Sequence, residues 1–347
     1  METKKTDEKD FIEILKIFSP GTAIRTALND VMKARMGALI VVDKEGLSEI
    51  MEGGFEINCN FSPQKLVELA KMDGAIILSE DMKKILYSNT LLVPDMRIKT
   101  KETGTRHKAA ERTAKQLDTL VVAVSERKNK ITLYCGDISY VLDESSEILR
   151  RATETLQILE KQKDIFDDLL IHLNISEITF TTTMAEVCNV LQRIEIIQRI
   201  SDVIKKYLVE LGKEGLIASM RLRELTKNFG KERELIIKDY NSDYVDIKSS
   251  FDEMSFDFLL DVSNIARILF KEFHDKPITP RGFRILNKTN LSEKNVTLLT
   301  DEFASLNDIL DADKESLIRV LNDEGVVDLF IKNLDSIKEK ILEGKNI

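Results

Sequence analysis

The sequence predicts an α/β domain with a mixed central sheet, then an all-α spine and a small helical C-terminal domain. Three observations support this. Helical and strand patterns alternate near the N-terminus, two long amphipathic patterns without Pro or Gly follow, and short helical patterns separated by turn residues complete the chain. We therefore expect domains at residues 1–143, 144–276 and 277–347.

The first domain begins with helical signals. Apolar residues at helical spacing predict a helix over 11–18, which Ser19-Pro20-Gly21 ends, and a second helix over 22–35. Further helices are expected over 62–72 and after Thr105. Runs rich in β-branched residues predict strands at 38–42, 55–59, 75–78, 120–124 and 130–134.

The two long patterns cover 148–173 and 184–211. At 1.5 Å per residue, helices of this size would be roughly 40 Å long, which is typical of a spine. A plain helical bundle is the alternative. The short patterns after residue 276 favour a small interaction or DNA-binding module, and a simple helical cap fits them equally well.

Composition limits the classes of function. The net charge of −9 argues against a protein that binds polyanions over its whole surface, although a local basic site can still hold phosphate. Cys59, Cys135 and Cys188 are far apart, so neither a disulfide framework nor a zinc site is expected. The sequence has no long uncharged apolar run and no apolar N-terminal signal, which predicts a cytoplasmic protein without membrane spans.

The segment Thr100–Arg112, T-K-E-T-G-T-R-H-K-A-A-E-R, has the residue types of a polyphosphate site. Gly104 allows close approach of the backbone, and Thr105 is a candidate N-cap at a helix start, where anions are favoured. A solvated basic helix start is the alternative. The cationic or cationisable donors that follow are Arg106, His107 and Lys108.

Two strand ends carry further polar residues. Asp73 precedes Gly74 and an apolar strand, and it is either a turn cap or a ligand for Mg²⁺, which needs only one or two carboxylates beside phosphate. Ser125-Glu126-Arg127 follows the strand at 120–124. The Ser125 hydroxyl could reach a phosphate, or it could simply end the strand in solvent.

Six motifs together resemble one known family, the DNA integrity scanning protein DisA family of bacterial diadenylate cyclases. They are G-A-L-I-V-V (37–42), M-E-G-G-F (51–55), E-L-A-K-M-D-G-A-I-I-L (68–78), L-V-P-D (92–95), T-K-E-T-G-T-R-H-K (100–108) and V-S-E-R-K (124–128). The resemblance covers the whole chain in order, as a cyclase domain, a helical spine and a helix-hairpin-helix region. It is most specific over residues 20–140.

The resemblance implies that two ATP molecules are condensed into cyclic di-AMP with release of two pyrophosphates, using Mg²⁺ or Mn²⁺. It also implies that two cyclase domains face each other within a homo-oligomer, expected to be an octamer, and that the protein senses DNA damage through DNA binding. The competing interpretation is a DNA-sensing scaffold, or an ATP-binding regulator, whose cyclase site is weakened.

The family's roles transfer to individual residues of this chain. Asp73 would bind the metal and help to deprotonate the 3′-hydroxyl, Gly74 and Ala75 would lie against the nucleotide, and Leu92 would pack on adenine. The phosphates would be held by Thr105, Arg106, His107, Lys108 and Ser125.

The sequence departs from the family at two places. Lys108 stands where Arg is common, which keeps the charge but loses the bidentate fork, and Ala109 stands where Thr is frequent. The second hairpin, over 319–328, has a single glycine, Gly325, in place of a G-I-G-like turn. The acids Asp323, Glu324 and Asp328 around it would repel phosphate, which argues against tight DNA binding.

Overall fold

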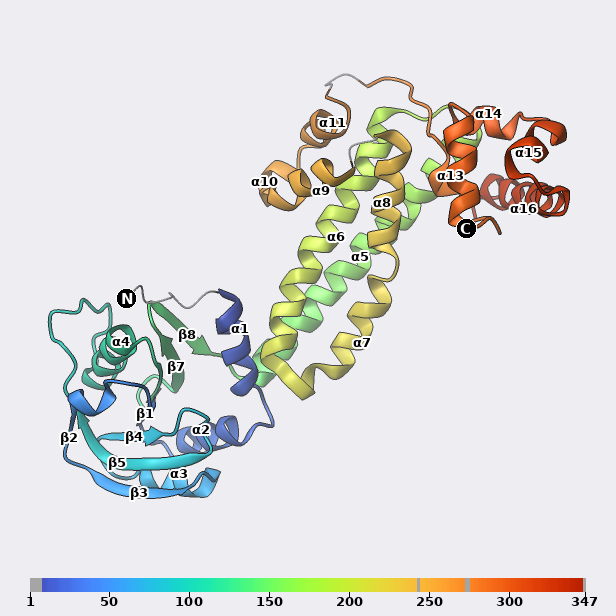
Figure 1. The fold of residues 1–347 in the computed structure, drawn as a ribbon. Coiled ribbons are helices and arrows are strands. Elements are labelled where there is room, and N and C mark those ends of the chain that lie inside the picture. Colours follow the sequence, from blue (N-terminus) through green and yellow to red (C-terminus); the bar gives the residue numbers. More distant parts are fainter. Residues whose placement is uncertain (1–7, 242–243, 272–274, 346–347) are drawn as a thin grey trace. The chain divides into compact units, whose positions relative to one another are not determined.

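The structure is a computed structural model that describes residues 8–241, 244–271 and 275–345. The chain forms two compact units (Figure 1). Unit 1 comprises Met1–Thr153 and Lys205–Ser219, and unit 2 comprises Glu154–Ile204 and Met220–Ile347. In the part of the chain that is described, no helix is both long and apolar enough to cross a membrane.

Unit 1 is built on an eight-stranded mixed sheet with the order β2-β5-β4-β1-β6-β7-β8, in which β3 also pairs with β5. Only β1 and β4 pair in parallel, and the other pairs are antiparallel. The strands are β1 Ala38–Val42, β2 Met51–Glu52, β3 Phe55–Asn60, β4 Ala75–Leu78, β5 Lys84–Leu92, β6 Leu120–Ser125, β7 Lys130–Cys135 and β8 Ile138–Leu142.

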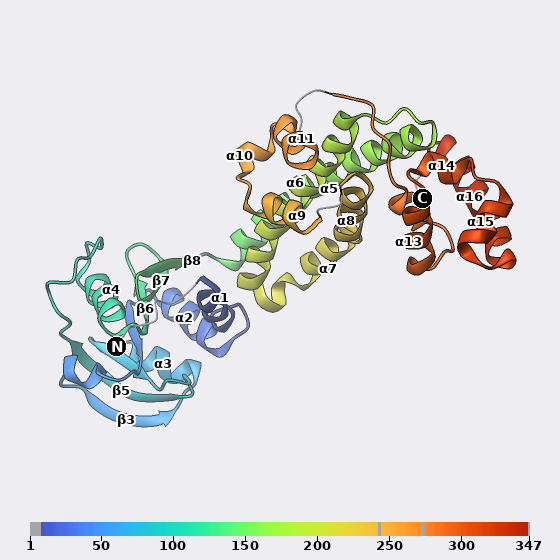
Figure 2. The same ribbon diagram turned by 45° about the horizontal axis from the view of Figure 1, so that its top comes forward.

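Helices cover both faces of this sheet. Alternate residues of β1 show how, because successive side chains of a strand point to opposite faces. Ile40 packs in a core with α1, α2 and α3, whereas Leu39 and Val41 pack in a second core with α4. Figures 1 and 2 show α4 separated from α2 and α3 by the strands. The helices are α1 Glu8–Ile17, α2 Ala23–Lys33, η1 Leu47–Ile50, α3 Pro63–Leu69 and α4 Thr105–Leu117.

All five expected strands and the four expected helices of this domain are confirmed, and so is the mixed sheet. Strand β5 was not predicted, because its polar stretch Ser88-Asn89-Thr90 interrupts the apolar pattern. Asn89 has a φ of 56°, and the pairing of β5 with β4 shifts register along its length. The short strands β2 and β8 were also missed.

The two long helical patterns are confirmed. Helix α6, Met184–Leu211, has the expected bounds, and α5, Ser145–Ile178, extends beyond the expected 148–173 at both ends. Neither helix contains Pro or Gly, so nothing in the backbone interrupts them.

Shorter helices complete the chain. Helices α13–α16 of the expected C-terminal region lie together in Figure 2. They pack around one apolar core, which includes Leu299, Leu317 and Phe330. The break expected at 323–325 coincides with the start of α16, which has 19 residues and begins at Glu324. The helices are η2 Gly212–Gly215, α7 Leu216–Leu225, α8 Phe229–Tyr240, α9 Tyr244–Glu253, α10 Phe256–Leu259, α11 Val262–Phe270, α12 Phe283–Leu286, α13 Glu293–Glu302, α14 Leu306–Leu310, α15 Lys314–Leu321 and α16 Glu324–Leu342.

A buried charged cluster joins α5, α8 and α12 within unit 2. The Arg284 side chain is fully buried and forms an ion pair with Glu177, which is buried as well. Asp239 of α8 accepts hydrogen bonds from the backbone N–H groups of Gly282 at 2.7 Å and Arg284 at 2.9 Å. It therefore caps the start of α12 and fixes this helix on α8.

We predict that Arg284→Leu lowers the free energy of unfolding of unit 2 by about 3–5 kcal/mol, because Glu177 would stay buried without its counter-charge. Urea denaturation followed by circular dichroism measures this. The matched control is Arg221→Leu in the same unit, since Arg221 pairs with Glu160 at 2.9 Å on the surface and should contribute less than about 1 kcal/mol. Equal costs for the two variants would contradict the prediction.

Candidate functional site

Strand pairing gathers several of the predicted site motifs of unit 1 at one end of the sheet. One row of paired residues crosses four strands, namely Thr90 of β5, Ala75 of β4, Leu39 of β1 and Ala123 of β6. Because β1 and β4 are parallel while β5 and β6 run opposite to them, the starts of the first two meet the ends of the other two. Segments that are far apart in sequence therefore lie next to each other at this end.

Gly74 is required by the backbone at this edge. Its φ is +92°, a conformation that side chains disfavour. A Cβ atom on Gly74 would also lie 2.8–2.9 Å from backbone atoms of Asn89 and Thr90. The glycine therefore lets the turn before β4 pass against β5, directly beside the pocket described below.

The start of α4 corrects one prediction. Gly104, not Thr105, is the N-cap, and Thr105 is already the first helical residue. Gly104 has extended backbone angles, φ −82° and ψ 142°, and no side chain caps the helix. The first turn also contains no acidic residue. The N–H groups of this turn are therefore available to an anion, as expected for a helix start.

Arg106 has its guanidinium group against the backbone of Gly37, just before β1. A Cβ atom on Gly37 would lie only 1.9 Å from Arg106 Nη1, so a larger residue there would displace the guanidinium. Arg106 is half-buried, and it has no hydrogen-bond or ion-pair partner among the described residues. Its donors are thus available to a ligand.

A pocket of about 740 Å³ opens at this end of the sheet. It brings together six of the nine predicted site residues, which come from the turn before β4, from β5, from α4 and from the end of β6. Its lining comprises Leu39, Gly74, Thr90, Leu91, Leu92, Thr103, Gly104, Thr105, Arg106, His107, Ala109, Ser125, Glu126 and Arg127.

The other three predicted residues do not line this pocket. Ala75 is fully buried in β4, in the row of residues next to the pocket. Asp73 is exposed in the turn before Gly74, and Lys108 is half-buried in the first turn of α4. Both are adjacent in the chain to lining residues.

No group of three or more His, Cys, Asp or Glu side chains that could hold a metal occurs among the described residues. Asp73 is an exposed carboxylate, and no described residue forms an ion pair with it. Mg²⁺ usually keeps several waters and takes one or two carboxylates together with substrate phosphates. Asp73 therefore fits a metal that arrives with a nucleotide better than one in a cage of protein ligands.

His107 lies in a mixed electrostatic environment. Burial lowers its pKa, the charge of Glu102 opposes this, and Lys128 and Arg106 lower the pKa further. Its ring meets the ring of Tyr134 edge to face, with the centroids 6.4 Å apart. His107 is therefore mostly neutral at pH 7 in the unliganded protein, and a bound anion would favour its charged form.

Sequence reasoning missed Thr90. This residue is fully buried, it lines the pocket, and its hydroxyl has no hydrogen-bond partner among the described residues. No sequence signal could have identified it, because β5 itself was not predicted. Glu126 and Arg127 directly follow the predicted Ser125 in the sequence, and all three line the pocket.

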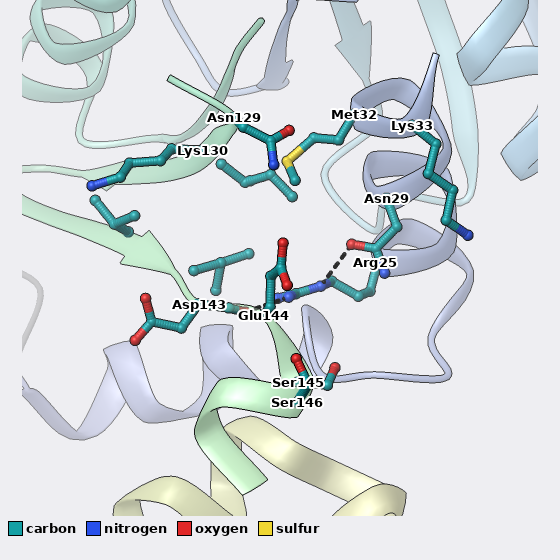
Figure 3. A pocket seen from close by; sticks show the side chains of 13 residues that line it. Arg25, Asn29, Met32, Lys33, Asn129, Lys130, Asp143, Glu144, Ser145 and Ser146 are labelled. Carbon is teal, nitrogen blue, oxygen red and sulfur yellow. Dashed lines mark hydrogen bonds between the residues drawn. The ribbon is translucent and has the colours of Figure 1, made fainter. Parts of the chain in front are cut away.

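Unit 1 contains a second pocket, of about 510 Å³, between α2, β7, β8 and the start of α5 (Figure 3). Its buried Arg25 donates to Asn29 Oδ1 at 3.2 Å and to the backbone oxygen of Asp143 at 2.6 Å. Its lining carries Lys33 and Lys130 as well as Asp143 and Glu144. Arg25 thus connects α2 to the segment that leads into α5.

Comparison with known proteins identifies the family. Residues 25–138 match the family described as "DisA bacterial checkpoint controller nucleotide-binding", and residues 142–273 match "DisA bacterial checkpoint controller linker region". A solved structure of a DacA double mutant from Staphylococcus aureus is 29% identical, covers 42% of this chain and 95% of its own, and has a TM-score of 0.31.

Full-length relatives are similar along almost the whole chain. The DNA integrity scanning protein DisA of Clostridioides difficile (strain 630) is 41% identical over 354 residues, which cover 98% of this chain and 99% of the relative. DisA of Acetivibrio thermocellus is 43% identical over 329 residues, with 91% and 90% covered. The chain therefore belongs to the DNA integrity scanning protein DisA family.

Proposed function

We propose that the 740 Å³ pocket of unit 1 binds ATP and that the protein condenses two ATP molecules into cyclic di-AMP and two pyrophosphates. The observation that carries this proposal is the convergence of Gly74, Leu92, Arg106 and Ser125 on one pocket from four separate segments. Membership of the DisA family, which consists of diadenylate cyclases, supports it.

The start of α4 is suited to the triphosphate. Uncapped N–H groups of the first turn and the unpaired guanidinium of Arg106 can together neutralise phosphate charge, which is the main contribution of a protein to phosphoryl transfer. Thr105, His107 and Ser125 add donors from the same lining. Lys108 would act from the same turn as a single point charge. Leu92 and Gly74 of the same lining would contact the nucleoside, and the neighbouring Ala75, buried in β4, would support them from within the sheet.

Asp73 is the proposed metal ligand. Its exposed carboxylate beside Gly74 could share Mg²⁺ or Mn²⁺ with the phosphates. The metal, when bound, would stabilise the charge of the reacting phosphate. The carboxylate itself would help to take the proton of a 3′-hydroxyl group.

Each reaction joins two nucleotides, so two pockets must meet. In each of two steps, a 3′-oxygen would bond to an α-phosphorus, a proton would leave the oxygen, and pyrophosphate would depart. One pocket of this volume holds one ATP, and the exposed position of Asp73 fits a role at a surface where a second copy docks. We propose a homo-oligomer with facing cyclase domains, of which an octamer is the expected form, in the cytoplasm.

The three-domain division is also a proposal. The family matches at 25–138 and 142–273 support boundaries near residues 143 and 276, and residues 277–347 would form a helix-hairpin-helix-like domain with a degenerate second hairpin. At that hairpin, Asp323 caps α16 by accepting from the Val326 N–H at 3.1 Å. Lys314 pairs with Glu324 at 3.0 Å and Asp328 at 2.7 Å. We therefore propose that DNA is bound weakly.

We predict that Asp73→Asn reduces cyclic di-AMP formation by about 100-fold or more while the fold is kept, because the change removes the charge that binds the metal. The measurement is mass spectrometry of products after incubation with ATP and Mg²⁺ or Mn²⁺. Asp137→Asn, an exposed carboxylate of the turn between β7 and β8, is the control and should be fully active. Undiminished turnover of the Asp73 variant would exclude the assigned role.

The need for two pockets predicts that activity per subunit falls on dilution. Light scattering and specific activity, measured on the same dilution series, should decrease together, because one domain holds only half of the reactants. A monomer with full activity per subunit would contradict the facing arrangement.

We expect branched or duplex DNA to bind with a Kd within roughly 10⁻⁴ to 10⁻⁶ M at physiological salt, the usual range of non-specific binding. The reason is that Asp323 already accepts a hydrogen bond from the Val326 N–H of the hairpin. Lys314 is already paired with Glu324 and Asp328. A gel-shift titration with a four-way junction tests this. Joint replacement of Asp323, Glu324 and Asp328 by their amides should tighten binding, whereas sub-micromolar affinity of the unchanged protein would show that another surface binds DNA.

A further inference from the structure

We propose that Glu111 is a positioning residue for the phosphate-binding start of α4, because it fixes the loop that leads into this helix. This inference rests on the proposed ATP site. This loop, the 99–104 segment, directly precedes the first helical residue, Thr105. Its last two residues, Thr103 and Gly104, line the pocket.

Glu111 is a buried carboxylate that uses both of its oxygen atoms. Oε2 accepts hydrogen bonds from the Thr100 hydroxyl and, at 3.2 Å, from the Lys101 backbone N–H. Oε1 accepts from Lys115 Nζ at 2.6 Å, one turn further along α4. Only 7% of Glu111 is exposed, so these contacts replace water almost completely.

Thr100 and Lys115, the two side chains that donate to Glu111, also contact the backbone of the 99–104 segment. Lys115 Nζ also donates to the backbone oxygen of Lys99 at 3.2 Å, and the Thr100 hydroxyl accepts from the Glu102 N–H at 3.0 Å. The carboxylate of Glu111 is therefore the centre of a network that holds residues 99–102 against the side of α4.

Tyr134 of β7 holds Glu102, the last of these residues before Thr103. Its hydroxyl donates to Glu102 Oε1 at 2.9 Å. Burial raises the pKa of Tyr134, and the contact with Glu102 raises it further, so the hydroxyl remains a donor at neutral pH. Only Thr103 and Gly104 lie between Glu102 and the first helical residue, Thr105. Fixing Glu102 therefore limits where these two pocket residues can lie.

The negative charge of Glu111 is part of this arrangement. Burial raises its pKa, but the contacts with Lys115 and Thr100 outweigh burial, so the pKa lies below its usual value and the group stays ionised. The amide of a glutamine at this position has one oxygen, which could accept hydrogen bonds either from Lys115 or from Thr100 and Lys101. Its NH₂ group would then face the other set of donors and could not accept from them. One side of the network must then open.

A purely structural role would have a different signature from a positioning role. Loss of stability reduces the fraction of active protein and hence the apparent kcat, and it leaves the KM of the folded molecules unchanged. Displacement of Thr103, Gly104 and the first turn of α4 weakens phosphate contacts in every molecule, so the KM for ATP rises.

The test compares Glu111→Gln with the unchanged full-length protein. We expect the KM for ATP to rise about tenfold, the order expected for lost hydrogen bonds to a charged group, with a smaller change in kcat. Calorimetric titration with 3′-deoxy-ATP, which cannot condense, should show the same weakening of Kd. Adding Lys115→Gln to the variant removes the donor that the new amide would face, and KM should partly recover.

The matched control is Glu68→Gln, because Glu68 of α3 pairs with Lys71 at 2.7 Å on the surface of the same unit, and its KM should not change. If Glu111→Gln does not fold, Tyr134→Phe takes its place, since it removes the hydroxyl that donates to Glu102 and keeps the ring beside His107, and a KM increase of a few fold is expected. An unchanged KM and Kd in the folded variants, with an active parent protein, would overturn this inference alone. A parent protein that neither binds ATP nor forms cyclic di-AMP would overturn the proposed function and this inference together.

Discussion

The parallel pairing of β1 with β4 is the constraint on which the site depends. It sets the starts of two strands side by side, and the antiparallel neighbours β5 and β6 then bring their ends to the same place. The glycine turn at Gly74, the end of β5 at Leu92 and Ser125 after β6 meet for this reason. A pocket lined by short motifs that are distant in sequence is thus a direct consequence of strand order.

Helix α4 lies at this end of the sheet, and two features of its first turn lower stability as long as no ligand is bound. Its first turn has neither a side-chain cap nor an acidic residue, and Arg106 has no partner among the described residues. Each of these lowers stability slightly, and each would be compensated by a bound polyanion. Gly37 leaves room for the Arg106 guanidinium, which links the first motif of the chain to the basic motif at the start of α4.

Two helix starts in unit 2 differ from the start of α4, because carboxylates accept hydrogen bonds from their backbone N–H groups. Asp239 accepts from the N–H groups at the start of α12, and Asp323 accepts from an N–H at the start of α16. Amides that are already hydrogen-bonded to carboxylates are poor ligands for phosphate, and the carboxylates repel it. The start of α4 is thus open to an anion, whereas carboxylates already occupy N–H groups at the starts of α12 and α16.

Local periodicity and residue type were enough to predict β1, β4 and α6, because their apolar residues recur at the spacing of one strand or helix. The motifs containing Gly74, Arg106 and Ser125 were also visible, since their chemistry depends on residues adjacent in sequence. Strand β5, with Thr90 inside it, is stabilised by pairing with strands on either side rather than by its own pattern. The contacts of Glu111 likewise depend on a loop folding back over a helix. Strand β5 and the contacts of Glu111 were therefore decided only by the tertiary structure. The residues that bury them and form hydrogen bonds with them come from elsewhere in the chain.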